Sequence, residues 1–258
     1  MAEQSGIIPL KGTIGNITFF KSKSGARARE KSGIDANRIK NDPAFERTRE
    51  NGAEFGRAGK ATKLLRTAFQ SVLLNISDSY MFSRMVRDMM KVIRADATNP
   101  RGQRNVIDGE AELLTGFNFN ANASLGSTLF APFTPSIDRA TGVLKVDLPP
   151  FIPINMVAVP GGATHFKVIA AGAAIDFEAG TFVNGTADST ALPINGTATE
   201  ALSLTINVAA NSTQPLFLAV GIVFYQEVNG TKYGLKNGTF NALSLVSISG
   251  AVPPPPGP

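Results

Sequence analysis

The chain of 258 residues contains no cysteine, no tryptophan and a single histidine. Without cysteine it has neither disulfide bonds nor thiolate metal sites. His165 has no second histidine or paired carboxylate near it in the sequence, so neither a metal site nor a nucleophilic triad is indicated. The composition therefore predicts no catalytic centre, no metal and no cofactor, and favours a protein that is not an enzyme. Hydrolases that use only carboxylates are the enzyme class that composition leaves open.

Charge is scarce in the second part of the chain. Residues 111–258 hold five basic and eight acidic residues, whereas residues 1–110 hold 20 of the 25 lysines and arginines beside 12 acidic residues. The net charge is therefore +8 in the first segment and −3 in the second. An independent soluble monomer usually carries about twice the charge density of this second segment. The asymmetry favours contact with nucleic acid, with an anionic surface or with the weakly acidic region of another copy.

A long apolar run and a secretory leader are also missing. The longest apolar run, residues 215–225, is about half the ~20 residues needed to cross a bilayer, so it predicts a buried strand and no membrane span. Residues 1–6 lack the basic and apolar regions of a signal peptide. We expect a protein made in the cytoplasm, with its final location open between a cytoplasmic assembly, a virion-like particle and an extracellular filament.

Residues 1–40 predict a small β arm, in which turns containing glycine separate strand-like pieces at 7–10, 16–20 and 26–29. A short hairpin is marginal alone and needs a surface, either its own domain or a neighbouring copy that accepts it by strand addition. In the second case Ile14, Ile17 and Phe19 are the expected anchors. The predicted assembly interface of the arm consists of its apolar residues, namely Ile7, Ile8, Leu10, Ile14, Ile17, Phe19 and Phe20.

Residues 41–105 predict a helical region. Asp42 caps the first helix, Pro43 occupies its first turn, and an apolar face extends to about residue 72. A second helix, 77–96, has an apolar stripe that consists of Phe82, Met85, Val86, Met89 and Ile93. Four of the six methionines lie in this helix, where filling a core is favoured over forming an adaptable binding surface.

Three glycines of the first helix are added to the predicted assembly interface. Gly52, Gly56 and Gly59 share the face opposite the apolar one, although each costs ~1 kcal/mol relative to alanine in a helix. Close approach of another backbone would offset this cost. The alternative is a loop at residues 51–60.

Basic residues of the arm and of the first helix form a candidate basic patch, namely Lys21, Lys23, Arg27, Arg29, Lys31, Arg49, Lys60 and Lys63. Each positive side chain can neutralise a phosphate and release counterions. Acidic residues are interspersed among them, and no recognition motif has the required spacing. Nucleic acid is therefore a less favoured partner than further copies of the chain.

Residues 106–250 predict an antiparallel β-sandwich of jelly-roll or immunoglobulin-like type, followed by a flexible proline-rich tail at 251–258. Turn signals at residues 138–142 and at four Asn-Gly pairs separate the strands, and Gly221 suggests a β-bulge. The fold class is therefore α+β, a β arm and helical hairpin followed by the sandwich. The predicted strands are 113–120, 125–131, 143–148, 154–159, 164–171, 174–178, 200–208, 215–226 and 239–248.

The N-terminal segment resembles the opening of a family of uncharacterised proteins that are common in Bacteroidota genomes. The residues that carry the resemblance are 12–20, the turn at Gly25, 29–31 and 42–52. The match covers about residues 6–66 and extends less closely through the β region. The resemblance implies a bacterial or phage-like origin and brings no activity, substrate or catalytic residue with it.

Together these features favour a non-enzymatic structural subunit that assembles with copies of itself into a filament, tube or shell, through exchange of N-terminal strands. Opposed charges in the two segments suit head-to-tail contacts, which propagate unless the rotation closes a ring. Two alternatives remain open. One is a protein that binds nucleic acid through its basic N-terminal region, and the other is a surface adhesin or carbohydrate-binding module.

Overall fold

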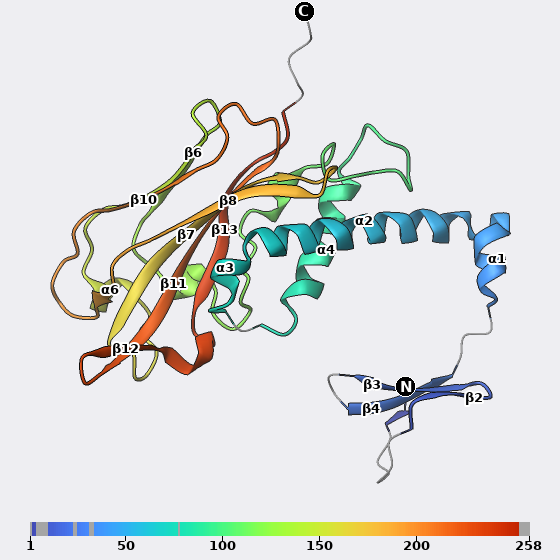
Figure 1. Ribbon diagram of the computed structural model, residues 1–258, viewed down its shortest axis with the longest axis horizontal. Coiled ribbons are helices and arrows are strands. Elements are labelled where there is room, and N and C mark those ends of the chain that lie inside the picture. Colours follow the sequence, from blue (N-terminus) through green and yellow to red (C-terminus); the bar gives the residue numbers. More distant parts are fainter. Residues whose placement is uncertain (1, 4–9, 23–24, 31–33, 77, 253–258) are drawn as a thin grey trace, which may run out of the picture. The chain divides into compact units, whose positions relative to one another are not determined.

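The computed structural model describes residues 2–3, 10–22, 25–30, 34–76 and 78–252 (Figure 1). The chain forms two compact units, Met1–Arg49 and Glu50–Pro258, which we call the N-terminal unit and the main unit. Their boundary lies within a helix, whereas the sequence predicted boundaries at residues 40 and 105. The N-terminal unit carries ten basic and five acidic residues, and the main unit carries 15 of each. The excess positive charge therefore belongs to the N-terminal unit.

The N-terminal unit contains a four-stranded antiparallel sheet in the order β1-β4-β3-β2. Asp42 caps the helical turn that follows, as predicted, by accepting a 2.9 Å hydrogen bond from the Ala44 N–H. Of the strand predicted at 7–10, residues 7–9 lie outside the described residues, and Leu10 is not in a strand. The elements are β1 (Ala2–Glu3), β2 (Gly12–Ile14), β3 (Ile17–Ser22), β4 (Gly25–Glu30), α1 (Ala36–Asn41) and η1 (Pro43–Phe45).

Two long helices follow, as the sequence predicted. They are α2 (Glu46–Ala68) and α4 (Met81–Arg94), with the short α3 (Gln70–Leu73) between them. Four of the five residues predicted to form the stripe of the second helix are buried, and Phe82 is the exception. Met81, Met85 and Met89 are buried in the core, so the core interpretation of these methionines is confirmed. Among the described residues, no helix combines the length and the apolar character that a membrane span requires.

The strands of the main unit form two antiparallel sheets, so the predicted α+β class with a β-sandwich is confirmed. In the large sheet, β7 (His165–Asp176) pairs with β11 (Leu216–Val228) along most of its length, and these two long strands lie side by side in Figure 1. β8 (Thr181–Asp188) and β9 (Leu192–Pro193) flank β7, while β12 (Thr231–Gly234) and β13 (Ala242–Ser249) flank β11. The small sheet has the order β10-β6-β5, with β5 (Thr134–Asp138), β6 (Val143–Leu148) and β10 (Leu202–Asn207).

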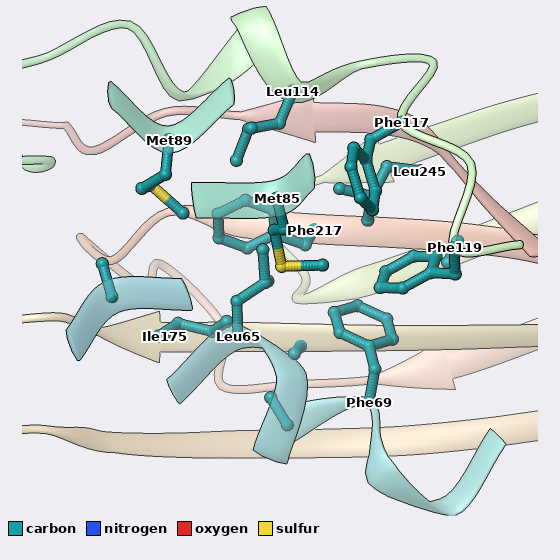
Figure 2. Close-up of a cluster of buried hydrophobic side chains, with 14 of the residues drawn as sticks. Leu65, Phe69, Met85, Met89, Leu114, Phe117, Phe119, Ile175, Phe217 and Leu245 are labelled. Carbon is teal, nitrogen blue, oxygen red and sulfur yellow. The ribbon is translucent and has the colours of Figure 1, made fainter. Parts of the chain in front are cut away.

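Both faces of β7 and β11 are buried, because helices cover one face of the large sheet and the small sheet covers the other. On the helix side, Leu65 and Met85 pack with Ile175 and Phe217 from the two strands (Figure 2). Alternate residues of the same strands pack against the small sheet, namely Phe166, Val168 and Ala170 of β7 and Leu218, Val220, Ile222 and Phe224 of β11. Full burial of each large side chain contributes about 1.5–3 kcal/mol. The main unit is therefore a helix layer and two sheets.

Three predicted strands are not strands of either sheet, although isolated antiparallel bridges within them pair Asn118 with Ser244 and Leu129 with Val157. Residues 113–120 include the end of η2 (Ala111–Leu114), and 125–131 and 154–159 include the helical turns α5 (Leu125–Thr128) and α6 (Pro153–Met156). These segments contain no charged residue, and in residues 117–120 apolar and polar side chains alternate as they do in a strand. The sequence therefore does not distinguish them from strands of the sandwich. Other errors concern boundaries, since 164–171 and 174–178 are parts of β7. The strands β1, β2, β5, β8, β9 and β12, and the helix α1, were not predicted.

One predicted Asn-Gly turn is also wrong. Asn184 and Gly185 lie within β8, where Gly185 pairs with Gly172 of β7. A Cβ atom on Gly185 would lie 2.8 Å from Cγ2 of Ile206, and one on Gly172 would lie 2.8 Å from Cδ2 of Leu144. The absence of side chains at this glycine pair therefore makes room for Leu144 and Ile206 of the small sheet. The prediction of a turn did not include this packing role. The Asn-Gly turn at 229–230 is confirmed by the positive φ angles of both residues.

The β-bulge predicted at Gly221 lies elsewhere. The register of β11 against β13 shifts between Leu218 and Ala219. Gly221 instead passes close to the neighbouring strand, where an added Cβ would lie 2.5 Å from the carbonyl oxygen of Ala242. A close approach between two backbones, and not a bulge, therefore requires this glycine.

Arg139 joins the two sheets, and its replacement provides a test of the fold. Its guanidinium, in the turn after β5, donates to carbonyl oxygens of Ser212, Gln214, Ser249 and Gly250 at the ends of β11 and β13. Because the Arg139→Met variant leaves these acceptors without their donor, we expect the free energy of unfolding to fall by about 3 kcal/mol, measured by urea denaturation. Lys145→Met, which removes an exposed ion pair with Asp147, is the matched control with an expected loss under about 1 kcal/mol. Equal losses in both variants would contradict this role.

The buried side chain of Glu54 makes the stability of the main unit depend on pH. Its carboxylate is 1% exposed and accepts hydrogen bonds from Arg104 and from the Gly102 N–H. Burial alone would raise the pKa of Glu54, but these hydrogen bonds lower it below its ordinary value of 4.5. The stabilisation is therefore complete above the unfolded pKa and is lost as pH falls through the lower folded pKa.

We expect the Glu54→Gln variant to be about 2 kcal/mol less stable than the wild type at pH 7. The difference should shrink as pH falls below about 4.5, because the wild-type carboxylate is then protonated. Urea unfolding of both proteins at a series of pH values measures this. The Glu50→Gln variant, whose ion pair with Arg101 is looser at 3.6 Å, is the control and should differ little from wild type. A difference for Glu54→Gln that is constant with pH would contradict the assignment.

Candidate functional site

The sheet of the N-terminal unit has one apolar face. Ile14 is opposite Ile17, and Phe19 is opposite Ala28. Side chains alternate along each strand, so these four residues and Ala26 share one side of the sheet, which we call the apolar face. Lys21, opposite Ala26, and Glu30, opposite Ile17, lie on the same side. Ile14 is 64% exposed and Ile17 is 46% exposed. No described residue from 10 to 22, 25 to 30 or 34 to 49 is buried, so this sheet encloses no core of its own there.

The opposite side of the sheet is polar and basic. It carries Thr13, Thr18, Phe20, Arg27 and Arg29 by the same alternation. The hydroxyls of Thr13 and Thr18 are 3.1 Å apart, and the guanidinium of Arg29 lies 5.5 Å from the centre of the Phe20 ring. An arginine over an aromatic face is a favourable cation–π arrangement. We call this side the basic face.

The predicted basic residues are thus not on one surface. Arg27 and Arg29 lie on the basic face, whereas Lys21 is on the side of the apolar face. Arg49 donates to the carbonyl oxygens of Ile39 and Asp42, both at 2.9 Å, and so holds the connection between α1 and α2. The remaining members are Lys60 and Lys63, which belong to the main unit, and Lys23 and Lys31, which lie outside the described residues.

The predicted assembly residues of the arm divide in the same way. Ile14, Ile17 and Phe19 lie together on the apolar face, and Phe20 lies on the basic face. Leu10 is exposed. Ile7 and Ile8 are outside the described residues. The three expected anchors therefore form one surface, because alternation along β3 groups Ile17 with Phe19 and the pairing of β2 with β3 adds Ile14.

The three helix glycines lie in an unbroken helix, so a loop at residues 51–60 is not what the structure shows. Nothing lies within 4 Å of a Cβ placed on Gly52, Gly56 or Gly59. Phe55, next to Gly56, is 59% exposed. The expected close approach of another backbone is thus absent within the described chain, and its supply by another molecule stays a prediction.

A second exposed apolar surface belongs to the main unit. Two loops lie side by side there, since the Phe130 N–H donates to the Met156 carbonyl and the Ala158 N–H donates to the Thr128 carbonyl. The uncharged segments 113–137 and 148–164 contain these loops. Their exposed apolar side chains, which we call the loop patch, are Phe130, Ile152, Ile154, Met156 and Val159. Where exposed apolar side chains lie together on a surface, they commonly mark an interaction site.

A cavity of about 900 Å³ lies between α2, the loop at 103–108 and the connection between β7 and β8. Lys60 and Lys63 line it, together with the apolar side chains of Leu64, Phe177 and Phe182. Helical spacing places the two lysines on one face of α2, but it does not predict the cavity. Arg57 also lines it and lies one turn before Lys60, so helical spacing could have found this residue. No local signal could have found the two phenylalanines.

Both ring nitrogens of His165 have polar partners, which is consistent with a structural role for this side chain. Its Nε2 lies 3.4 Å from a carboxylate oxygen of Glu227, and its Nδ1 lies 3.0 Å from the hydroxyl of Thr164. In the part of the chain that the structure describes, no three histidine, aspartate or glutamate side chains are grouped in a way that could hold a metal ion.

No protein-family model matches this chain, and no curated protein matches it in sequence. One solved structure aligns with 46% of this chain and with 80% of the other chain, at 11% identity and a TM-score of 0.24. It comes from work described as pH-induced modulation of Streptococcus parasanguinis adhesion by Fap1 fimbriae. A score of this size supports no inference about fold or function.

Proposed function

We propose that the chain is a non-enzymatic structural subunit that associates with copies of itself, and that the apolar face of the N-terminal sheet is a contact surface. The observation that carries the proposal is that Ile14 and Ile17 of this face are exposed, in a unit where none of the residues 10–22, 25–30 and 34–49 is buried. A small sheet without a core is marginal in water, and burial of Ile14, Ile17 and Phe19 against another molecule stabilises it. A second copy of the chain can provide such a surface.

The loop patch of the main unit is the receiving surface that fits best. It is apolar and lies in segments without charged residues, so the charges at a contact with the apolar face are those of Lys21 and Glu30 on that side of the sheet. The arginines of the basic face lie on the other side of the same sheet and stay in water. Contact between two different surfaces is head-to-tail, which generates a filament, or a ring if the rotation closes. The glycine face of α2 is a further surface where another backbone can approach closely.

The test replaces the anchors without removing the strands. In the variant Ile14→Thr, Ile17→Thr and Phe19→Thr, the β-branched threonines keep strand propensity while apolar area is lost. We expect wild type to form assemblies and this variant to be monomeric, as measured by size-exclusion chromatography with light scattering and by negative-stain microscopy. The thermal unfolding of the main unit should be unchanged, because none of the three residues belongs to it.

The matched control changes the opposite face, as Thr13→Ser, Thr18→Ser and Phe20→Thr, and should assemble like wild type. A wild-type protein that is monomeric at millimolar concentration would overturn the proposal. So would assemblies of full size in the anchor variant.

A second candidate function is binding of single-stranded nucleic acid on the basic face, favoured by the arrangement of Arg29 over Phe20. If this holds, an oligonucleotide binds with an affinity that falls with salt, and Arg27→Gln with Arg29→Gln reduces the slope of log K against log[salt] by about 1.4. Fluorescence anisotropy measures the slope. Arg47→Gln with Arg66→Gln, which removes the same charge from exposed positions of α2, is the control. Identical slopes for the two double variants would rule out a specific role for this face.

A further inference from the structure

The cavity beside α2 has a fixed apolar wall. Leu64, Phe177 and Phe182 line it and also pack against the core between the helices and the large sheet. The ring of Phe177 lies edge-on to that of the buried Phe217, with centroids 6.1 Å apart. These contacts hold the wall in place independently of any ligand. The volume of about 900 Å³ lies within the range of small-molecule sites.

The α2 side of the cavity is positively charged. Lys60 and Lys63 are one helical turn apart and therefore share a face. Both side chains are exposed, and neither forms an ion pair with a described residue. Arg57, in contrast, donates to the carbonyl oxygens of Gly102 and Arg104, so its guanidinium is already engaged. The two lysines are thus the cations available to a ligand.

Two carboxylates also line the cavity, and neither forms an ion pair with Lys60 or Lys63. Asp108 accepts hydrogen bonds from the side-chain amides of Asn99 and Asn105, at 2.8 and 2.7 Å. Glu178 lies in the connection between β7 and β8 and forms no ion pair with Lys60 or Lys63. An acidic group that enters the cavity is therefore attracted to α2, while the β7–β8 side offers aromatic surface.

From this arrangement we infer that the cavity is a binding site for a small amphipathic anion. The ligand has a carboxylate, phosphate or sulfonate group that contacts Lys60 and Lys63, and an aromatic or aliphatic body that lies against Leu64, Phe177 and Phe182. Apolar burial supplies affinity and the two lysines supply the preference for an acidic group. The site lies within the main unit and shares no residue with the apolar face, the loop patch or the glycine face of α2, although Lys60 and Lys63 lie one turn after Gly56 and Gly59 on that helix.

The experiment compares two fluorescent probes with similar ring systems. 8-Anilinonaphthalene-1-sulfonate carries an acidic group, and N-phenyl-1-naphthylamine is its neutral counterpart. The full-length chain with Ile14→Thr, Ile17→Thr and Phe19→Thr serves as background, because it removes the apolar face as a competing probe site. Lys60→Gln with Lys63→Gln is the test variant, and Arg47→Gln with Arg66→Gln is the control with the same net charge on the same helix.

We expect the Kd of the sulfonate probe to rise about five- to tenfold in the lysine variant and to stay unchanged in the arginine control. The Kd of the neutral probe should be the same in both. Phe182→Ala, with its fold checked by thermal unfolding, should weaken both probes. The inference is overturned if the sulfonate probe does not bind, or if it binds the two double variants equally. Neither result bears on self-association, which light scattering measures separately.

Discussion

Burial of both faces of β7 and β11 is the constraint on which the main unit depends. Each strand presents apolar side chains alternately to the helices and to the small sheet, so neither layer can be removed without exposing a continuous row of them. The helices α2 and α4 therefore share a hydrophobic core with the large sheet of the sandwich. The cavity lies where the β7–β8 connection faces α2, so the same layering positions its lysines and its aromatic wall.

Features set by local sequence could be predicted, and features set by distant contacts could not. The helices α2 and α4 were found because their apolar residues recur with helical spacing and because Asp42 and Pro43 mark a start that depends on neighbours alone. The uncharged segments 113–137 and 148–164 gave three wrong strands, because an apolar residue that covers the edge of a sandwich has the same chemistry as one inside a strand. Gly185 looked like a turn because Ile206, which explains it, is in another sheet.

The candidate surfaces show the same division. Alternation along β3 was enough to group Ile17 with Phe19, and the pairing of β2 with β3 adds Ile14. The sequence grouped Lys21 with Arg27 and Arg29, although the register places it on the other side of the sheet. Only the lysines of the cavity could be grouped from local sequence, because Lys60 and Lys63 are neighbours on α2. Phe177 and Phe182 come from a distant part of the chain.

The pairing of Gly172 with Gly185 has a mechanical consequence for the sandwich. The two missing side chains leave a depression in the large sheet, and the methyl carbon Cγ2 of Ile206 occupies it. Displacement of the small sheet by two residues along β7 would bring this methyl against Ala170 or Ala174, which lie on the same side of β7 as Gly172 and have Cβ atoms. The two sheets are therefore prevented from sliding past one another, and a pulling force along the strands meets resistance from steric interlocking in addition to hydrogen bonds.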